Sequence, residues 1–191
     1  KTSFEWRHKI LAAIRALEGG ISFSGIVEAD ELLMKYSEKG RKFKNKEEYR
    51  RAKKKKHPKV AVLVVTDREG NLLFKQVGEK KVKNEQLREE LKSRLSENNL
   101  ICVKPKKEFR KGVKGLQSKK VIVNKRQIKR GIYSIKIVES KISDFKTWLS
   151  RFHGVATKYL QSYLMWFVIM NKYLKELIDP DIGRLLNLSS H

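Results

Sequence analysis

The segment FSGIVEADELL, residues 23–33, is the part of the sequence that most directly predicts the fold. Its apolar residues alternate or run together, as in a β-strand, and Glu28, Asp30 and Glu31 stand near its end. Carboxylates in so apolar a strand are costly to bury unless they are paired or used in chemistry. We therefore expect these acids to have partners or to belong to a functional site.

The next two apolar segments predict strands that pair with the first. They read KVAVLVVT, residues 59–66, and NLLFKQVG, residues 71–78. The connection between them, DREG, ends in Gly70, which can adopt the positive φ that a hairpin needs. Together with the first strand, the two segments predict an antiparallel meander.

A helix and two further strands are predicted downstream of the meander. Asn84 can cap a helix that has Leu at every fourth position, and the short apolar run LICV follows at 100–103. A helix between two strands implies a crossover into a parallel pairing. Residues 107–119 then predict an interrupted helix, and VIVN at 121–124 predicts a fifth strand. This order is typical of an α/β fold.

Both ends of the chain are predicted to be helical. Thr2 and Glu5 have the spacing of a capping box. The apolar residues that then recur at helical spacing are Trp6, Ile10, Ala13 and Leu17. Residues 142–152 are amphipathic, and a long apolar helix is predicted from about 155 to 178. We divide the chain into an N-terminal helix at 1–20, a core at 21–153 and a C-terminal helical segment at 154–191.

The charge of the chain indicates a polyanionic partner. Lys and Arg number 45 against 21 Asp and Glu, which gives a formal net charge of +24, although 40% of the residues are hydrophobic. Such an excess attracts nucleic-acid phosphates or an anionic membrane surface. The longest charge-free apolar stretch, 159–171, is shorter than the roughly 20 residues that cross a bilayer. We therefore expect nucleic acid, and no membrane, as the partner.

Basic residues are densest in residues 37–59, which we interpret as a flexible or weakly helical insertion in the core. From 39 to 59 the sequence reads KGRKFKNKEEYRRAKKKKHPK, with two acids. Because the whole protein is basic, we expect this insertion to contact phosphates. The residues expected to bind nucleic acid are Arg41, Lys42, Lys44, Arg50, Arg51, Lys53, Lys54, Lys55, Lys56 and Lys59.

Cysteine usage and the start of the chain bear on the compartment. Cys102 is the single cysteine, which excludes an internal disulfide or a cysteine zinc site within this chain. No signal peptide opens the sequence. We expect a cytoplasmic protein and, because a helix already begins at the first residues, further residues upstream of Lys1.

Three stretches resemble the transposases of bacterial insertion sequences that have a DDE-type catalytic core. They are TSFEWRHKIL at 2–11, FSGIVEADE at 23–31 and KTWLSRFHGVATKYLQSYLMWF at 146–167, the last being the most specific. The resemblance implies a ribonuclease H-like fold, a five-stranded mixed sheet flanked by helices, with a helical N-terminal segment and a long C-terminal helix. It also implies a bacterial protein in which residues 1–20 are the remnant of an upstream DNA-binding region.

The resemblance further implies a catalytic site. In the family, carboxylates from the first strand, the end of the fourth strand and a helix after the fifth clamp two divalent ions. Asp30 matches the first position, in the family's Glu-Ala-Asp-Glu context, and Glu139 falls at the third. The second position is typically the Asp of Thr-Asp-Gly or Ser-Asp-Gly, whereas here Lys104 and Pro105 stand there. The catalytic set is therefore degenerate.

Lys104 reverses the charge where a metal ion needs oxygen ligands. We hypothesise that its ammonium neutralises Asp30, and with it Glu139, as an internal counter-ion. No metal or other cofactor is then expected, whereas an active protein would hold Mg²⁺ or Mn²⁺ at Asp30 and Glu139. The structural alternatives are a strand-end Asp30 paired with any neighbouring Lys and an ordinary solvated Glu139.

His153 and the aromatic residues of the last stretch are interpreted as structural. A lone His beside Gly154 suggests packing at a helix break rather than catalysis. The aromatic side chains recur at helical spacings, so we expect them in the core or in a subunit contact rather than stacked on bases. They are Tyr159, Tyr163, Trp166, Phe167 and Tyr173.

Three functions remain open at this point, and we favour the first. It is a transposase-derived, catalytically inactive nucleic-acid-binding protein, serving as an accessory subunit of a larger complex such as an RNA-guided nuclease. The second is an active DDE-type transposase that performs metal-dependent DNA strand transfer, with the missing acid supplied by a residue such as Glu108. The third is a homodimeric assembly or scaffold protein. The expected partners are DNA, or RNA in its place, a second copy of the chain and a protein of such a complex.

Overall fold

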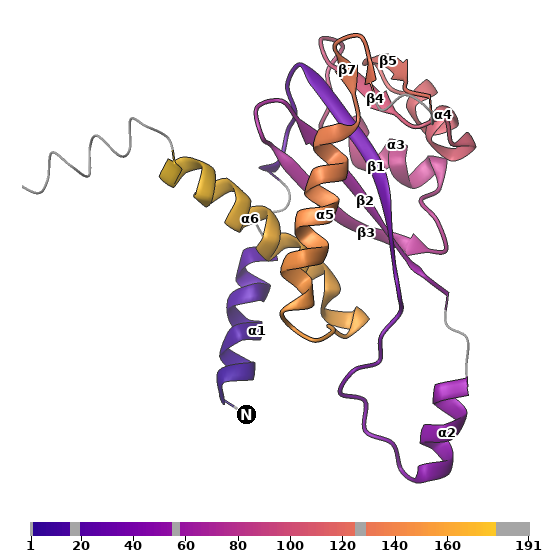
Figure 1. Cartoon of the computed structure of the whole chain (residues 1–191), viewed down its shortest axis with the longest axis vertical. Helices are drawn as coiled ribbons and strands as arrows, with labels where there is room; N and C mark the ends of the chain where they lie inside the picture. The colour runs from indigo at the N-terminus through magenta and orange to yellow at the C-terminus, as the bar shows by residue number, and fades with distance from the viewer. Residues whose placement is uncertain (1, 16–19, 55–57, 125–128, 179–191) are drawn as a thin grey trace, which may run out of the picture.

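Five strands form one mixed sheet in the order β3-β2-β1-β4-β5 (Figure 1). The computed structural model describes residues 2–15, 20–54, 58–124 and 129–178. β1 and β2 pair antiparallel, as do β2 and β3, whereas β4 runs parallel to β1 and to β5. The predicted meander and crossover are thereby confirmed. The strands are β1 Ile26–Met34, β2 Val60–Asp67, β3 Leu72–Glu79, β4 Leu100–Val103 and β5 Lys119–Ile122.

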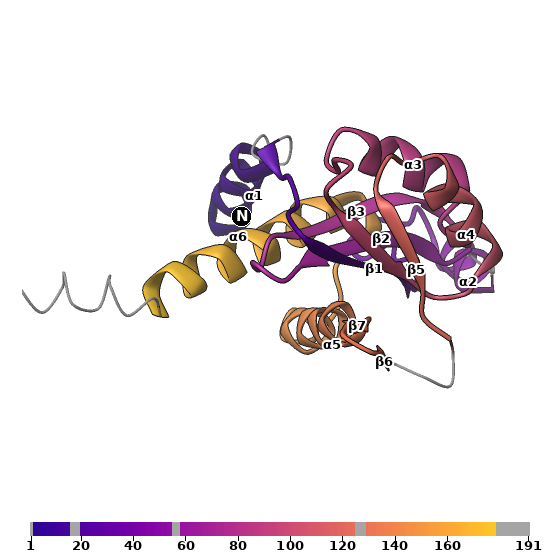
Figure 2. The same ribbon diagram turned by 90° about the horizontal axis from the view of Figure 1, so that it is seen from above.

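Helices cover both faces of this sheet, which is the predicted ribonuclease H-like architecture (Figure 2). α3 and α4 pack together on one face, and α5 lies on the other. α6 packs on β3 and contacts α1, whereas α2 stands apart in the basic insertion. The helices are α1 Thr2–Arg15, α2 Lys46–Lys54, α3 Asn84–Lys92, α4 Lys107–Lys114, α5 Lys136–Ser150, the 3-10 helix η2 Thr157–Tyr159 and α6 Leu160–Ile178. Two short strands, β6 Lys129–Arg130 and β7 Tyr133–Ser134, form a separate hairpin.

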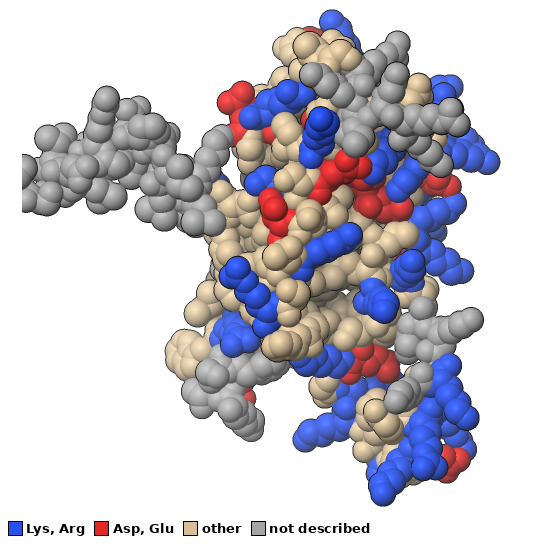
Figure 3. Space-filling view, viewed as in Figure 1, with Lys and Arg blue, Asp and Glu red and all other residues tan. Residues whose placement is uncertain are grey.

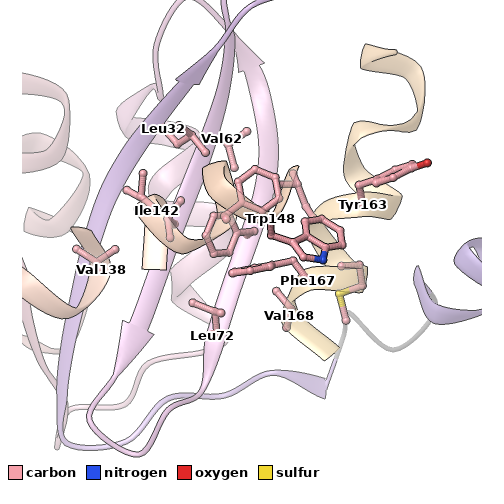
Figure 4. Packing of buried hydrophobic residues seen from close by; sticks show 14 of the residues in the cluster. Leu32, Val62, Leu72, Val138, Ile142, Trp148, Tyr163, Phe167 and Val168 are labelled. Atoms are coloured by element: carbon pink, nitrogen blue, oxygen red, sulfur yellow. The ribbon is translucent and has the colours of Figure 1, made fainter. Parts of the chain in front are cut away.

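β2 is buried along its whole length, so its alternating side chains contribute to two cores. Val62 and Val64 face the cluster formed with α5 and α6, whereas Leu63 and Val65 face the cluster formed with α3 and α4. Figure 4 shows the first cluster, in which Trp148 and Phe167 lie together. The aromatic residues predicted for the core are confirmed there where their side chains are described: Tyr159 of η2, and Tyr163, Trp166 and Phe167 of α6.

Several predicted boundaries are wrong, and tertiary contacts explain the differences. β1 begins at Ile26 rather than at Phe23 and ends at Met34, one residue beyond the predicted end, because it pairs with β2 from Val27 to Met34. α5 begins at Lys136, not near Ile142, because its first backbone N–H groups have a buried acceptor described below. Lys83, rather than Asn84, is the N-cap of α3.

The predicted apolar face of α1 is also wrong. Trp6 and Ile10 are 60% and 58% exposed, whereas Leu11 is buried and the His8 ring lies 4.1 Å from that of Tyr159. The contact with α6 therefore selects a different face from the one that periodicity suggests. His153 does mark the predicted helix break, with a φ of 50°, but its side chain is exposed rather than packed. None of the described helices is both long and apolar enough to cross a membrane.

Cys102 allows a direct test of this core. Its thiol is buried in β4, and burial, followed by the negative charge of Glu28, raises its pKa to about 11. A protonated, inaccessible thiol reacts slowly. We therefore expect a thiol reagent at near-neutral pH to label Cys102 only in molecules that have unfolded. The labelling rate should rise with urea in parallel with the loss of helical circular dichroism. Fast labelling without denaturant would contradict this packing.

Candidate functional site

Glu28 of β1 holds the beginning of α5. Its carboxylate is completely buried and accepts hydrogen bonds from the N–H groups of Ile137 and Val138, at 2.8 and 3.1 Å. The Ser134 hydroxyl donates a third at 2.8 Å, and Arg68 lies 3.7 Å away. A carboxylate at a helix N-terminus satisfies free N–H groups and faces the positive end of the helix dipole. The sheet therefore fixes where α5 starts.

The parallel pairing of β1 and β4 brings Asp30 beside Lys104. Ala29 is opposite Val103 in the register, so the residues that follow, Asp30 and Lys104, come together as β4 ends. The Lys104 Nζ donates a hydrogen bond to Asp30 Oδ2 at 2.6 Å. The side chain of Asp30 is only 6% exposed, which makes this charged partner essential to its burial.

Glu139 reaches the same ammonium from α5. It lies in the first turn of the helix that Glu28 caps, and its Oε1 is 2.7 Å from Lys104 Nζ. Burial alone would lower the pKa of Lys104, but the hydrogen bonds to Asp30 and Glu139 outweigh it, so the pKa is raised. The side chain is therefore an ammonium at neutral pH, held between two carboxylates. The structure thus brings together the three residues that the sequence singled out.

Lys106 adds a second cation to this cluster. Its Nζ is 3.7 Å from Asp30 Oδ1 and 3.1 Å from Glu31 Oε2. Glu31 also accepts a hydrogen bond from the Val82 N–H at 2.5 Å. The sequence predicted a partner or a functional role for Glu31, but it did not identify Lys106, although a Lys two positions after Lys104 could have suggested it.

These side chains line a hollow of about 480 Å³ between β1, the end of β4 and α5. Lys146 also lines the hollow. Its walls therefore have three acidic side chains, Asp30, Glu31 and Glu139, and three lysines, Lys104, Lys106 and Lys146. A divalent ion needs oxygen ligands, and here the ammonium of Lys104 lies within hydrogen-bonding distance of both candidate carboxylates. The residues present therefore do not fit the two metal ions of a DDE site. Within the described residues, no group of three His, Cys, Asp or Glu is placed to hold a metal.

Glu108 does not complete the set. It lies in the first turn of α4, where its carboxylate pairs with Lys81, and it does not line the hollow. A register shift that carried Glu108 into the hollow would break the observed pairing of β1 with β4.

The model of a family described as the ISXO2-like transposase domain matches residues 22–170. The chain belongs to this family. The match runs from just before β1 into α6, and so includes the Asp30, Lys104 and Glu139 cluster.

Other comparisons add less for this transposase domain. A comparison with curated proteins finds no match. Among solved structures, the domain is similar to the crystal structure of a pre-cleavage Mos1 transpososome, with 10% sequence identity and a TM-score of 0.35. The similarity covers 92% of this chain and 61% of that one, so the chain spans less than two thirds of the Mos1 chain.

The basic insertion of the transposase domain is only partly available to phosphates. Arg41 pairs with Glu38 and Glu48, and Arg51 pairs with Glu47. The predicted residues that are exposed, and whose side chains have no acidic partner within the described part of the chain, are Lys42, Lys44, Arg50, Lys54 and Lys59. Lys55, Lys56 and the side chain of Lys53 lie outside the described residues.

The structure shows a second basic surface, on α4, that was not predicted from the sequence. We call it the α4 stripe, and it consists of Lys107, Arg110, Lys111 and Lys114. All four are exposed, and within the described residues none pairs with an acid. Phe109 and Val113 anchor the opposite face, and an added Cβ on Gly112 would lie 2.7 Å from Leu87, so α4 is packed tightly on α3. Helical spacing could have revealed the stripe.

The α4 stripe continues from the cluster at the end of β4. Lys104 and Lys106 line the hollow, and Lys107 is the first residue of α4. In Figure 3, acidic side chains gather near the middle of the visible face, whereas Lys and Arg surround them and extend to the rim. The cations of the α4 stripe therefore follow directly in sequence on the two lysines that pair with the carboxylates.

Substitution of Glu28 tests how α5 is positioned. Glu28→Gln leaves one acceptor oxygen for three donors and removes the charge that faces the helix N-terminus. We expect the free energy of unfolding to fall by roughly 1.5–3 kcal/mol, the range for a charged hydrogen bond. Urea denaturation followed by circular dichroism measures this change. Glu97→Gln, at an exposed position, is the matched control and should change stability little; equal effects of the two substitutions would show that Glu28 does not anchor α5.

Proposed function

We propose that this transposase domain binds nucleic acid, DNA in the first instance, and no longer cuts strands. The observation that carries the proposal is the Lys104 ammonium, which lies 2.6 Å from Asp30 and 2.7 Å from Glu139. Membership of a transposase family and a net charge of +24 support contact with DNA. In this proposal Asp30 and Glu139 are vestigial catalytic residues, and Lys104 balances the charge that metal ions balance in an active site.

Nucleic-acid binding in this proposal depends on the α4 stripe as well as on the insertion. The four cations of the stripe project from one face of a helix that is packed tightly on α3. This packing holds the backbone positions of the four residues fixed relative to one another. Contacts of this kind recognise the phosphate backbone and not the sequence. Binding should therefore be strong at low salt and weakly selective for sequence.

An accessory role in a larger nucleic-acid-processing complex fits a domain that binds without cutting.

The aromatic residues that could have served a homodimer pack within the chain's own core, with Tyr163 and Phe167 buried. This packing makes them unsuitable as an exposed dimer surface and favours the nucleic-acid-binding role over the scaffold role.

Restoring the acid at position 104 tests the proposed loss of metal-dependent chemistry. Lys104→Asp places a third carboxylate beside Asp30 and Glu139, so we expect saturable Mg²⁺ binding in isothermal titration calorimetry. The unaltered chain and Lys104→Met, which removes the ammonium without adding a ligand, should show none. Saturable Mg²⁺ binding by the unaltered chain, or strand transfer with Mg²⁺ or Mn²⁺, would refute the proposed inactivity.

Neutralising the α4 stripe tests the proposed DNA contact. Each phosphate contact contributes about −0.9 to the negative slope of log affinity against log salt. Changing all four residues to Gln should therefore make this slope shallower, by up to roughly 3–4. The control changes Lys9, Lys35, Lys83 and Lys172 to Gln, four exposed residues on separate parts of the chain with the same total charge. Fluorescence anisotropy with duplex DNA across a salt series measures both. Equal losses would mean that only net charge matters and that the stripe is not a contact surface.

A further inference from the structure

A second hollow, of about 640 Å³, lies between α1 and the turn that precedes α6. Its described lining residues include four cations and no Asp or Glu: Arg7, Lys39, Arg151 and Lys158. The FHGVATKYL segment, residues 152–160, forms part of the lining of this hollow. It contributes no residue to the hollow at Asp30, Lys104 and Glu139. We call the second hollow the α1–α6 pocket.

Lys39 fixes the wall of the α1–α6 pocket. Its Nζ donates hydrogen bonds to the carbonyl oxygens of Phe152, His153 and Gly154, at 3.1, 3.0 and 2.9 Å. These bonds stabilise a turn in which His153 and Gly154 have φ values of 50° and 94°. Because all three acceptors are neutral, the positive charge of Lys39 is not cancelled.

The other three cations have no acidic partner within the described residues. Arg7, Arg151 and Lys158 are exposed at the pocket. His8, which also lines the pocket, responds to this positive charge. Its pKa is lowered, first by burial and then by the charges of Arg7 and Lys158. A pocket with this uncompensated charge attracts an anion.

We propose that the α1–α6 pocket binds a phosphate group of nucleic acid together with its adjoining nucleotide. Arg7, Arg151 and Lys158 would contact the phosphate oxygens, since guanidinium groups match phosphate geometry and an ammonium adds a point charge. The volume suits a nucleotide, because small-ligand pockets measure about 300–1,000 Å³. This inference rests on the proposed nucleic-acid binding and adds a defined site to it. A backbone phosphodiester and a 5′-terminal phosphate offer the same chemistry, and the experiment distinguishes them.

The test compares two triple variants of the full chain. One changes Arg7, Arg151 and Lys158 to Gln, and its control changes Lys35, Lys83 and Lys172 to Gln. Both are checked for unaltered circular dichroism and then titrated with oligothymidylate carrying either a 5′-phosphate or a 5′-hydroxyl. We expect the pocket variant to bind about tenfold more weakly than its control, as for the loss of charge-assisted phosphate contacts. A loss confined to the 5′-phosphorylated probe assigns the terminal phosphate, and an equal loss for both probes assigns a backbone phosphate.

A direct reporter separates this inference from the proposed function. The imidazole proton resonances of His8 should shift, and the pKa of His8 should rise, when the 5′-phosphorylated probe or inorganic phosphate is added. If the two triple variants bind alike and His8 does not respond, the pocket is refuted while nucleic-acid binding stands. If the unaltered chain binds no oligonucleotide, the proposed function fails, and a His8 response to inorganic phosphate alone then decides whether the pocket is an anion site. An equal His8 response to polyglutamate would overturn the assignment to phosphate.

Discussion

The buried carboxylate of Glu28 joins the sheet to α5, and the site depends on that joint. It accepts the N–H groups of Ile137 and Val138, which sets the first turn of α5 against β1. Asp30 follows Glu28 by two residues on the same face of the strand, and Glu139 follows the capped N–H groups directly. One interaction therefore brings two further carboxylates to one place. Because Glu28 is completely buried, loss of its donors would leave an uncompensated charge in the core.

Two carboxylates held in this way require a cation, and the chain supplies its own. Lys104 reaches both, and Lys106 approaches the second oxygen of Asp30. A metal ion would provide the same charge balance only while bound, whereas a lysine side chain provides it permanently. The proposed loss of strand cutting is thus compatible with a retained fold, since electrostatic compensation no longer depends on a ligand.

Local sequence patterns predicted the strands and their order in the sheet, but not the features that depend on contacts between distant segments. The continuous apolar run of β2 and the helix between β3 and β4 predicted the sheet, and the pairing of β1 with β4 in that sheet brings Lys104 to Asp30. The start of α5 was missed because its signal is Glu28, 109 residues away from Ile137. The buried face of α1 was missed because α6 selects it, and periodicity alone favoured the exposed Trp6 and Ile10.

The basic surfaces illustrate a further limit on what a charge run reveals. The insertion has the densest run of cations, yet Glu38, Glu47 and Glu48 engage two of its arginines. The α4 stripe has fewer cations, but burial of Phe109 and Val113 turns all of them to one side. A polyanion responds to the charge presented on one surface rather than to charge per residue. In the proposed function, the cations on one helical face are therefore a better guide to phosphate contact than the length of a charge run.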